Sequence, residues 1–383
     1  MDFTFTEEQQ AACEAARNLF ADVTPDGVPS PSRTPGAVDD DFDRRLWARL
    51  ADADLLSLLL TPEYGGSGLD PVALCLVLRE SAKVVARVPL LETSAVAYAV
   101  QTYGSTDLKQ HTLTRAGRGD LVLTVAAHGR TGHDGAELAV TAHPDGGHWL
   151  LDGHQTAVPW AHNADLVAVP ATAPEGRTVL ALVPRDHPGV SLDEQIATHG
   201  ERLGALRLDS VRLPARDVIT ANGAWDFLRD LLTTGTCALA LGIGSAVLTM
   251  TSGYTSKREQ FGHPLATFQA VAVQAADRYI DLRAMEVTLW QAAWRLSSPE
   301  RATAGNGGPL PASGDVAVAK IWASDGVRRV VQTAQHLHGG FGADTDYPLH
   351  RYHAWAKYLE LSLGPAAAHE EALGDLLAAH TPS

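Results

Sequence analysis

Hydrophobic residues recur at helical spacing in the first and last parts of the chain. The pattern predicts an opening helix up to about residue 20, a second helix over 42–60, and further helices between 72 and about 118. Segments rich in Pro, Gly, Ser and Asp, at 22–41 and 61–71, are typical of loops. Beyond residue 222 two long helices are expected. Each carries an apolar face: Leu239, Ile243, Val247, Met250 and Tyr254 in the first, and Val273, Ala276, Ile280, Ala284 and Val287 in the second.

The pattern of hydrophobic and polar residues changes in the middle of the chain. Short segments rich in Val and Leu, such as 120–125, 165–171 and 206–213, are separated by Gly, Pro and Asp. This run of strands favours a β-barrel or sandwich of about 100 residues. Because helices and strands are segregated, the sequence predicts an α+β protein and not a Rossmann fold. We expect an N-terminal helical domain (1–118), a central β domain (119–220) and a C-terminal four-helix bundle (221–383).

Composition narrows the class of protein. The net charge of −15 repels phosphate backbones and anionic lipid, so we expect no nucleic-acid partner. We find no apolar run of about 18 residues and no secretory signal, and we expect no membrane association. The three cysteines, Cys13, Cys75 and Cys237, are far apart, which predicts free thiols in a reducing cytoplasm. No cluster of residues has the spacing of a metal site.

One short stretch interrupts the two long C-terminal helices. It reads REQFGHPLATFQ and covers residues 258–269. Arginine grips phosphate with a planar fork of donors, so Arg258 is a candidate anion ligand. The alternative is that Arg258 only complements the C-terminal dipole of its own helix. A later helix ends at Gly339 and Gly340, a common helix stop.

Several stretches together resemble one family, the flavin-dependent acyl-CoA dehydrogenases. They occur in the family's order and span nearly the whole chain: LADADLLSLLLTPEYGGSGLD (50–70), LRLDSVRLPARDVI (206–219), YTSKREQFGHPLATFQ (254–269) and VAVAKIWASDGVRRVVQTAQHLHGGFGADTDYPLHRY (316–352). The resemblance implies FAD as cofactor and an acyl-CoA or acyl-carrier thioester as substrate. It also implies an electron acceptor such as an electron-transfer flavoprotein.

The resemblance assigns cofactor residues. Residues matching Arg258, Phe261 and Gln269 reach the FAD of a neighbouring subunit, and the turn at Gly339 and Gly340 admits its phosphates close to backbone N–H groups. Two further positions carry alternatives. Thr124 faces the flavin edge or is an ordinary strand threonine, and His336 binds a phosphate or ribose or is a satisfied core histidine. The stretch that often covers the flavin is Ala-Val-Pro (157–159) here, with Trp160 next.

The catalytic base departs from the family pattern. The family's C-terminal glutamate falls at Leu363, and the alternative base position on the first bundle helix falls at Leu232. Asp230 and Glu360 are the nearest carboxylates along the chain, so they are our candidates for the catalytic base. The plainer interpretations are a helix N-terminal acid for Asp230 and a surface acid for Glu360.

The best function from sequence is therefore FAD-dependent α,β-dehydrogenation of an acyl thioester. The alternatives are a flavin-dependent oxidase or monooxygenase on the same scaffold, and a partner subunit that lacks its own base. Small residues between 238 and 246 and the shared flavin site predict a homo-oligomer (dimer or tetramer) or a heteromer with a related subunit.

Overall fold

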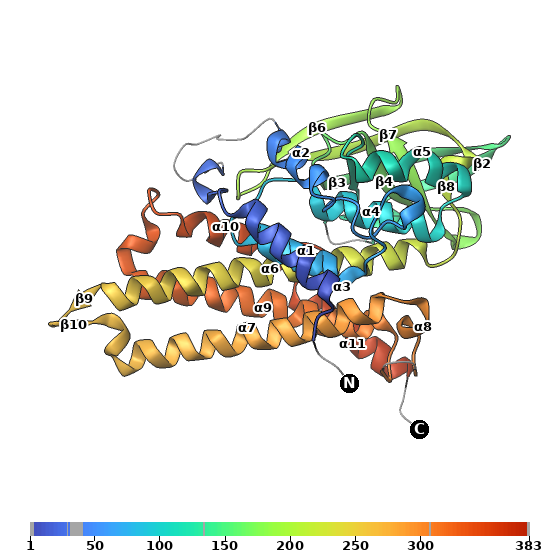
Figure 1. Cartoon of the computed structure of the whole chain (residues 1–383). Helices are drawn as coiled ribbons and strands as arrows, with labels where there is room; N and C mark the ends of the chain where they lie inside the picture. The colour runs from blue at the N-terminus through green and yellow to red at the C-terminus, as the bar shows by residue number, and fades with distance from the viewer. Residues whose placement is uncertain (1–3, 29, 31–40, 133–134, 306–307, 381–383) are drawn as a thin grey trace. The chain divides into compact units, whose positions relative to one another are not determined.

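A computed structural model describes residues 4–28, 30, 41–132, 135–305 and 308–380 (Figure 1). Contacts divide the chain into two compact units. The helical unit comprises residues 1–37, 71–86 and 233–383, and the sheet unit comprises 38–70 and 87–232. The predicted α+β class, with its helical N-terminal part, central sheet and C-terminal helical bundle, is confirmed. The three predicted domain boundaries stay a prediction.

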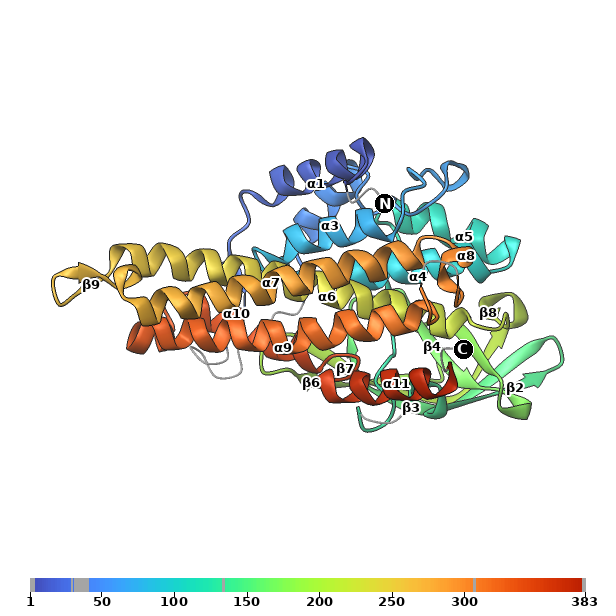
Figure 2. The same cartoon turned by 90° about the horizontal axis from the view of Figure 1, so that it is seen from below.

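The helical unit is built on long helices. Figure 2 shows α7 and α9 running side by side, and they are among the most extensively contacting elements. The unit contains α1 (Glu7–Phe20), α3 (Pro71–Ala82), most of α6 (Ala224–Lys257), α7 (Gln269–Leu296), α8 (Pro299–Ala302), α9 (Ala312–His338), α10 (Leu349–Leu361) and α11 (Ala366–Ala379). Short elements connect them: η1 (Pro25–Gly27), β9 (Glu259–Gln260), β10 (His263–Pro264), η6 (Leu265–Thr267) and η7 (Gly339–Ala343).

The small residues of α6 pack inside this unit. A Cβ on Gly242 would lie 2.3 Å from the carbonyl oxygen of Arg79 on α3, and one on Gly244 would lie 2.7 Å from Leu282 on α7. The close helix approach predicted from these residues is therefore used within the chain, and it gives no support to an oligomer. An 18-residue window of α6 has a mean hydropathy of 1.8, which we did not expect, but 78% of that window is buried inside the structure.

The apolar face predicted on α7 is exposed and does not face the core. Val273, Ile280 and Val287 are 52%, 62% and 57% exposed. The buried face of α7 is formed by other residues, including Leu282, Met285 and Leu289. Helical periodicity identifies a stripe, but it does not say whether the stripe faces its own chain or another.

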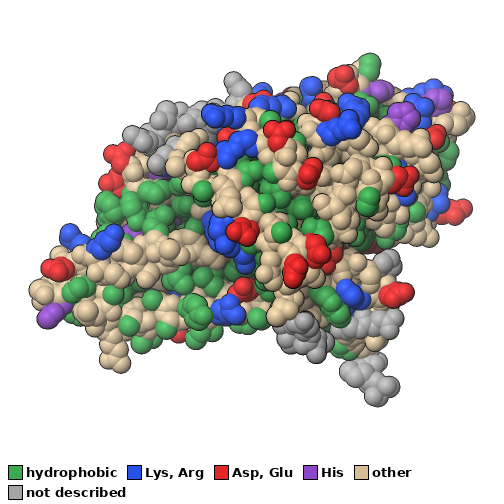
Figure 3. Space-filling model, in the orientation of Figure 1, with side chains coloured by type: hydrophobic (Ala, Val, Ile, Leu, Met, Phe, Trp, Pro, Cys, Tyr) green, Lys and Arg blue, Asp and Glu red, His purple; other side chains and the backbone are tan. Residues whose placement is uncertain are grey.

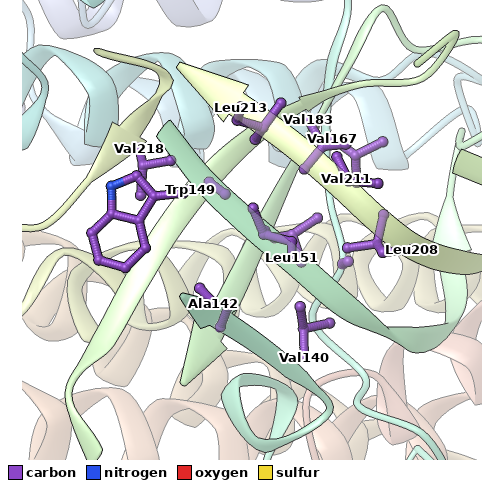
Figure 4. Close-up of a cluster of buried hydrophobic side chains, with 14 of the residues drawn as sticks. Val140, Ala142, Trp149, Leu151, Val167, Val183, Leu208, Val211, Leu213 and Val218 are labelled. Atoms are coloured by element: carbon purple, nitrogen blue, oxygen red, sulfur yellow. The ribbon is translucent and has the colours of Figure 1, made fainter. Parts of the chain in front are cut away.

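The sheet unit contains one continuous sheet of eight strands. Their order is β6-β7-β3-β2-β4-β5-β8, and β1 pairs in parallel with β4. The strands are β1 (Leu123–Val125), β2 (Val140–Asp145), β3 (His148–Pro159), β4 (Leu166–Thr172), β5 (Thr178–Pro184), β6 (Val190–Ile196), β7 (Arg202–Pro214) and β8 (Val218–Ile219). Figure 4 shows part of their core, where Leu151 and Val211 lie among other apolar side chains. Alternating burial in β2 and β7 matches the alternation in the sequence.

Three helices complete this unit. They are α2 (Arg44–Asp52), α4 (Leu90–Tyr103) and α5 (Thr106–Gly117), with short 3₁₀ turns η2 (Pro62–Tyr64), η3 (Ala136–Leu138), η4 (Pro174–Gly176) and η5 (Ala215–Asp217). The helix predicted over 42–60 ends early, at Asp52. Asp54 adopts φ +56°, and the N–H of Leu55 donates to the carbonyl oxygen of Leu50. This left-handed stop is common at helix ends, but aspartate signals it less clearly than glycine.

Candidate functional site

The turn between α6 and α7 forms an exposed tip. Strands β9 and β10 make a two-residue hairpin whose central residues, Phe261 and Gly262, both have positive φ, +56° and +79°. Glycine suits such a position, but a bulky aromatic residue there is strained. The side chain of Phe261 is nevertheless 91% exposed. Strain combined with exposure points to a function outside the chain.

Two polar residues of this tip, Arg258 and Gln269, are exposed. Within the described chain, the side chains of Arg258 and Gln269 have no hydrogen-bond or ion-pair partner. The backbone of Arg258 is fixed, because its N–H donates to Tyr254 and its carbonyl oxygen accepts from Leu265. Gln269 begins α7, whose N-terminus has no side-chain cap. Free N–H groups and a positive helix end favour an anion there.

The glycine turn lies at the C-terminal end of α9. Gly339 has φ +61° and ψ −139°, a conformation reserved for glycine, and a Cβ on Gly339 or Gly340 would meet no atom within 4 Å. The backbone is therefore open to a ligand on this side. His336 is exposed, so it is not a buried core histidine, and its role as a ligand stays a prediction. In the orientation that satisfies both ends of its amide, the side chain of Gln335 donates to the carbonyl oxygen of Gly342 at 2.9 Å. It accepts a hydrogen bond from the N–H of Ala343 at 3.1 Å.

An aromatic stack, which we did not foresee, connects the tip to the glycine turn. Tyr254, one helical turn before Arg258, stacks on His338 with ring centroids 4.3 Å apart and on Phe341 at 5.6 Å. The Nδ1 of His338 lies 2.8 Å from the carbonyl oxygen of Ala334, which fixes the ring. Burial lowers the pKa of His338, so the ring is held neutral. The stack sets the end of α6 against the end of α9.

Thr124, the predicted flavin residue of the sheet, is fully buried. Its hydroxyl donates to the carbonyl oxygen of Pro159 at 2.5 Å. The neighbouring residue Leu123 exchanges hydrogen bonds with Thr93 on α4 through its N–H and carbonyl groups. The hydroxyl of Thr124 therefore holds β1 to β3. Its contact with flavin stays a prediction, and this geometry favours the structural alternative.

The end of β3 is strained and held in place by polar contacts. Ala157 and Trp160 have φ +51° and +55°, and the N–H of Ala157 donates to Gln195 at 2.8 Å. The indole of Trp160 donates a hydrogen bond to the carboxylate of Glu92. Glu92 is half-buried at the start of α4, and burial raises its pKa to about 7. No sequence signal marks Glu92, because a single acid in a helix is usually solvated.

The two candidate bases lie in different units. Asp230 belongs to the sheet unit and is half-buried; burial raises its pKa to about 7, and the nearby Asp226 adds to the rise. Glu360 belongs to the helical unit. Its carboxylate lies 2.6 Å from Lys357 Nζ and 3.9 Å from Arg328 Nε, so it is already neutralised. The electrostatics therefore favour Asp230 over Glu360 as a proton acceptor at neutral pH.

Leu363, where the resemblance places the family's catalytic glutamate, lies in a turn after α10; this assignment stays a prediction. Leu363 adopts φ +57° and is followed by Gly364 at +98°. Just before this turn, the buried Lys320 donates to the carbonyl oxygens of Leu359 and Glu360 at 2.8 and 3.1 Å. Lys320 thus caps the end of α10. We did not predict this role.

Comparison with known proteins decides the family. The model for the acyl-CoA dehydrogenase N-terminal domain matches residues 6–120, and that for the C-terminal domain matches 233–377. The chain is 36% identical to the acyl-CoA dehydrogenase FadE27 of Mycobacterium tuberculosis, over the full length of both. This chain belongs to the acyl-CoA dehydrogenase family. Proteins of this family are FAD-dependent oxidoreductases that dehydrogenate acyl-CoA.

Two solved structures resemble this family member over almost its whole length. The ChsE4-ChsE5 complex from Mycobacterium tuberculosis contains a chain with 34% identity and a TM-score of 0.90, with both chains fully covered. The Tcur3481-Tcur3483 steroid ACAD contains a chain with 37% identity and a TM-score of 0.87, covering 98% of this chain and 99% of the other. The first is named as a complex of two components, and the name of the second also joins two components.

The residues of this family member fit FAD unevenly. The open glycine backbone at 339–340 and the unpaired Arg258 fit the charged half of the cofactor. On the sheet, the hydroxyl of Thr124 is already used by Pro159. In the described residues, no group of three or more His, Cys, Asp or Glu is placed to hold a metal ion.

Proposed function

We propose that this chain is the subunit of a heteromeric acyl-CoA dehydrogenase that lends its α6–α7 tip to FAD in a related subunit. The related subunit carries the catalytic glutamate. When bound, FAD supplies hydride acceptance from the acyl β-carbon. The contribution of this chain is to bind and orient: Arg258 pairs with the pyrophosphate, while Phe261 and Gln269 cover the cofactor from outside.

One contrast carries the proposal. The tip is prepared for a ligand that its own chain does not supply, since Arg258 has no partner among the described residues and Phe261 is 91% exposed. The residues expected to serve a flavin ring inside this chain have other roles or are absent. The hydroxyl of Thr124 donates to Pro159, and Leu363 stands where the resemblance places the catalytic base. A helper subunit, which lends its tip to the FAD of a related subunit and does not catalyse the reaction itself, explains both the unpaired tip and the incomplete flavin site.

The comparisons support two finer elements of the proposal. One similar structure is named as a two-component complex and the other carries a name that joins two components, which supports a heteromer over a homo-oligomer. One of them is a steroid ACAD with 37% identity, which supports a polycyclic acyl-CoA as the substrate class. We further propose a cytoplasmic location, supported by the three free, buried cysteines. An electron-transfer flavoprotein as acceptor stays a prediction.

Flavin absorbance tests the proposal. The chain is purified alone and after co-expression with an acyl-CoA dehydrogenase subunit from the same genome that carries the C-terminal glutamate. Only the co-expressed sample is expected to hold FAD in stoichiometric amount and to bleach anaerobically with acyl-CoA, including a steroid-derived acyl-CoA. If the chain alone is loaded with FAD and bleaches at the rate of the pair, the helper-subunit proposal is wrong.

A second function, dehydrogenation by this chain alone, is favoured by one observation. Burial raises the pKa of Asp230 to about 7, which suits a general base near neutral pH. Asp230→Asn keeps the shape of the side chain and removes its proton acceptor. In this case the chain alone would bleach with acyl-CoA, and Asp230→Asn would slow the bleaching at least about 100-fold with FAD still bound. A parental bleaching rate in Asp230→Asn would exclude Asp230 as the base.

A further inference from the structure

Phe341 presents an aromatic ring beside the glycine turn. It follows Gly340 directly in η7, and its side chain is 44% exposed. A Cβ on Gly339 or Gly340 would meet no atom within 4 Å, so the backbone beside the ring is open. Figure 3 shows hydrophobic side chains at the surface where α10 runs in Figure 1, and η7 contacts both α9 and α10. Single exposed apolar residues are ordinary, so the role of Phe341 depends on how its ring is held and on the charges around it.

The ring of Phe341 is held in a fixed orientation. It lies nearly parallel to the ring of Tyr254, at 12° with centroids 5.6 Å apart, and its centroid is 4.4 Å from that of Tyr347. These two rings are fixed in turn by His338. The hydroxyl of Tyr254 donates to the carbonyl oxygen of His338 at 3.4 Å, and the hydroxyl of Tyr347 lies 3.2 Å from its Nε2. A side chain that is fixed before a ligand arrives loses little freedom on binding, so Phe341 is preorganised for stacking.

The charges near Phe341 differ from the charge at the tip. Asp344 and Asp346 are exposed, and the N–H of Asp344 donates to the carbonyl oxygen of Phe341 at 3.2 Å. Two carboxylates repel a phosphate, but they are compatible with a neutral planar group that carries amino donors. Arg258, one helical turn beyond Tyr254, attracts a phosphate instead. This end of the helical unit therefore suits an anion at the tip and a neutral aromatic group at Phe341.

FAD combines the two kinds of group that these positions suit. Its pyrophosphate is anionic, and its adenine is a neutral planar ring with an exocyclic amino group, joined to the pyrophosphate through a single ribose. Every base has a π-face that can stack on an aromatic side chain. We propose that Phe341 stacks on the adenine of the FAD whose pyrophosphate Arg258 binds.

This inference rests on the proposed function and extends it from the pyrophosphate to the adenine. Arg258 recognises charge, which any phosphate ester supplies. A stacked adenine adds discrimination between cofactors, since FMN carries a phosphate but no adenine. In the proposed heteromer this chain then holds the ADP half of FAD, and the related subunit holds the flavin ring.

Flavin binding by the assembled pair, stripped of FAD, tests the role of Phe341. Phe341→Ala should raise the Kd for FAD about 5- to 150-fold and weaken competition by ADP to the same extent, while the Kd for FMN stays at the parental value. Fluorescence titration measures these constants without turnover. Phe341→Trp keeps an aromatic ring and should keep tight binding of FAD. The matched control is Trp322→Ala, which removes a ring that is 37% exposed elsewhere on α9 and should change none of the constants.

The outcomes separate this inference from the proposed function. An equal rise in the Kd for FAD and for FMN in Phe341→Ala would mean that the ring only supports the glycine turn, and an unchanged Kd for FAD would mean that it does not touch the adenine. Either result overturns the inference, and the helper function still stands if Arg258→Ala weakens FAD binding in the pair. If the parental chain alone holds FAD as tightly as the pair, the helper function is wrong, and the same comparison of FAD with FMN on the chain alone decides the role of Phe341.

Discussion

The hydroxyl of Thr124 donates a hydrogen bond to the carbonyl oxygen of Pro159 across 2.5 Å, from β1 to the end of β3. Both groups are buried, so each would lose its partner if the other were removed. The bond fixes the segment that ends in the strained Trp160. It thus explains how a threonine at a family cofactor position is retained for the fold.

Replacing Thr124 by valine should destabilise the subunit. The buried carbonyl of Pro159 would lose the hydrogen bond from Thr124, at a cost of about 1–3 kcal/mol in the free energy of unfolding. Thr124→Ser keeps the hydroxyl and serves as the control. Urea unfolding measures the difference, and flavin content of the assembled protein should stay at the parental level. Normal stability combined with loss of flavin would assign Thr124 to the cofactor.

Removing the guanidinium of Arg258 should weaken FAD binding in the assembled enzyme. A charge-assisted hydrogen bond contributes about 1.5–3 kcal/mol, which corresponds to a Kd about 10–150 times higher. Lys257→Ala, next along the chain and equally exposed, is the matched control. Fluorescence titration with FAD reports the Kd. An unchanged Kd in Arg258→Ala would show that the tip does not touch the cofactor.

The stability of the subunit should fall between about pH 4.5 and pH 7 on account of Glu92. Burial raises its pKa to about 7 in the folded chain from 4.5, so the folded state holds a proton that the unfolded state has released. The stabilisation is complete below pH 4.5 and is lost as the pH rises through 7. Asp230, whose pKa is also raised to about 7, contributes with the same sign.

Glu92→Gln isolates this contribution. It should match the parent near pH 4 and be more stable at pH 8, by on the order of 1–2 kcal/mol. Asp52→Asn, at an exposed position of α2, provides the comparison. Guanidinium unfolding at several pH values gives the slopes. A parental slope in Glu92→Gln would mean that the carboxylate is solvated.

Lys320→Met should loosen the end of α10. The carbonyl oxygens of Leu359 and Glu360 would lose the hydrogen bonds from Lys320, although Glu360 keeps the one from the hydroxyl of Ser324. Removal of a buried charge offsets part of the loss, so we expect a net destabilisation of about 1–3 kcal/mol. Burial lowers the pKa of Lys320 to about 8 from 10.5, so the parent should gain stability as the pH rises between these values. The variant should lack this gain in denaturation experiments, and Lys109→Met should keep it. Equal pH dependence in parent and variant would mean that the ammonium group of Lys320 is not desolvated.

The tip and the glycine turn could be predicted because their signals are local. A motif such as REQFG fixes residue types and spacing at once, and two glycines after a helical pattern mark a helix stop through their backbone conformation alone. The stripe of α7 shows the opposite case. Its helical period follows from the sequence, but the period alone does not say whether the apolar face is buried, and Val273, Ile280 and Val287 lie at the surface.

Two site features depend on contacts that no local pattern announces. Glu92 is unusual because burial raises its pKa to about 7, against the lowering effect of the hydrogen bond from Trp160, which lies 68 residues later. The stack of Tyr254 on His338 likewise joins two helices that are distant in the sequence. The sequence gives a weaker signal for Lys320. It falls at the apolar spacing of α9, between Val316 and Val327, and a lysine at such a position is a sign of burial.

The exposed Phe261 has a consequence for the cell. In the proposed heteromer, a copy of this subunit made in excess of its partner keeps this large apolar side chain in water, so chaperones and proteases recognise the copy as an orphan. Balanced expression of the two proposed subunits is then a condition for the accumulation of either one. We therefore expect the gene for this chain to be expressed in step with that of its proposed partner, and unassembled copies to turn over faster than assembled ones.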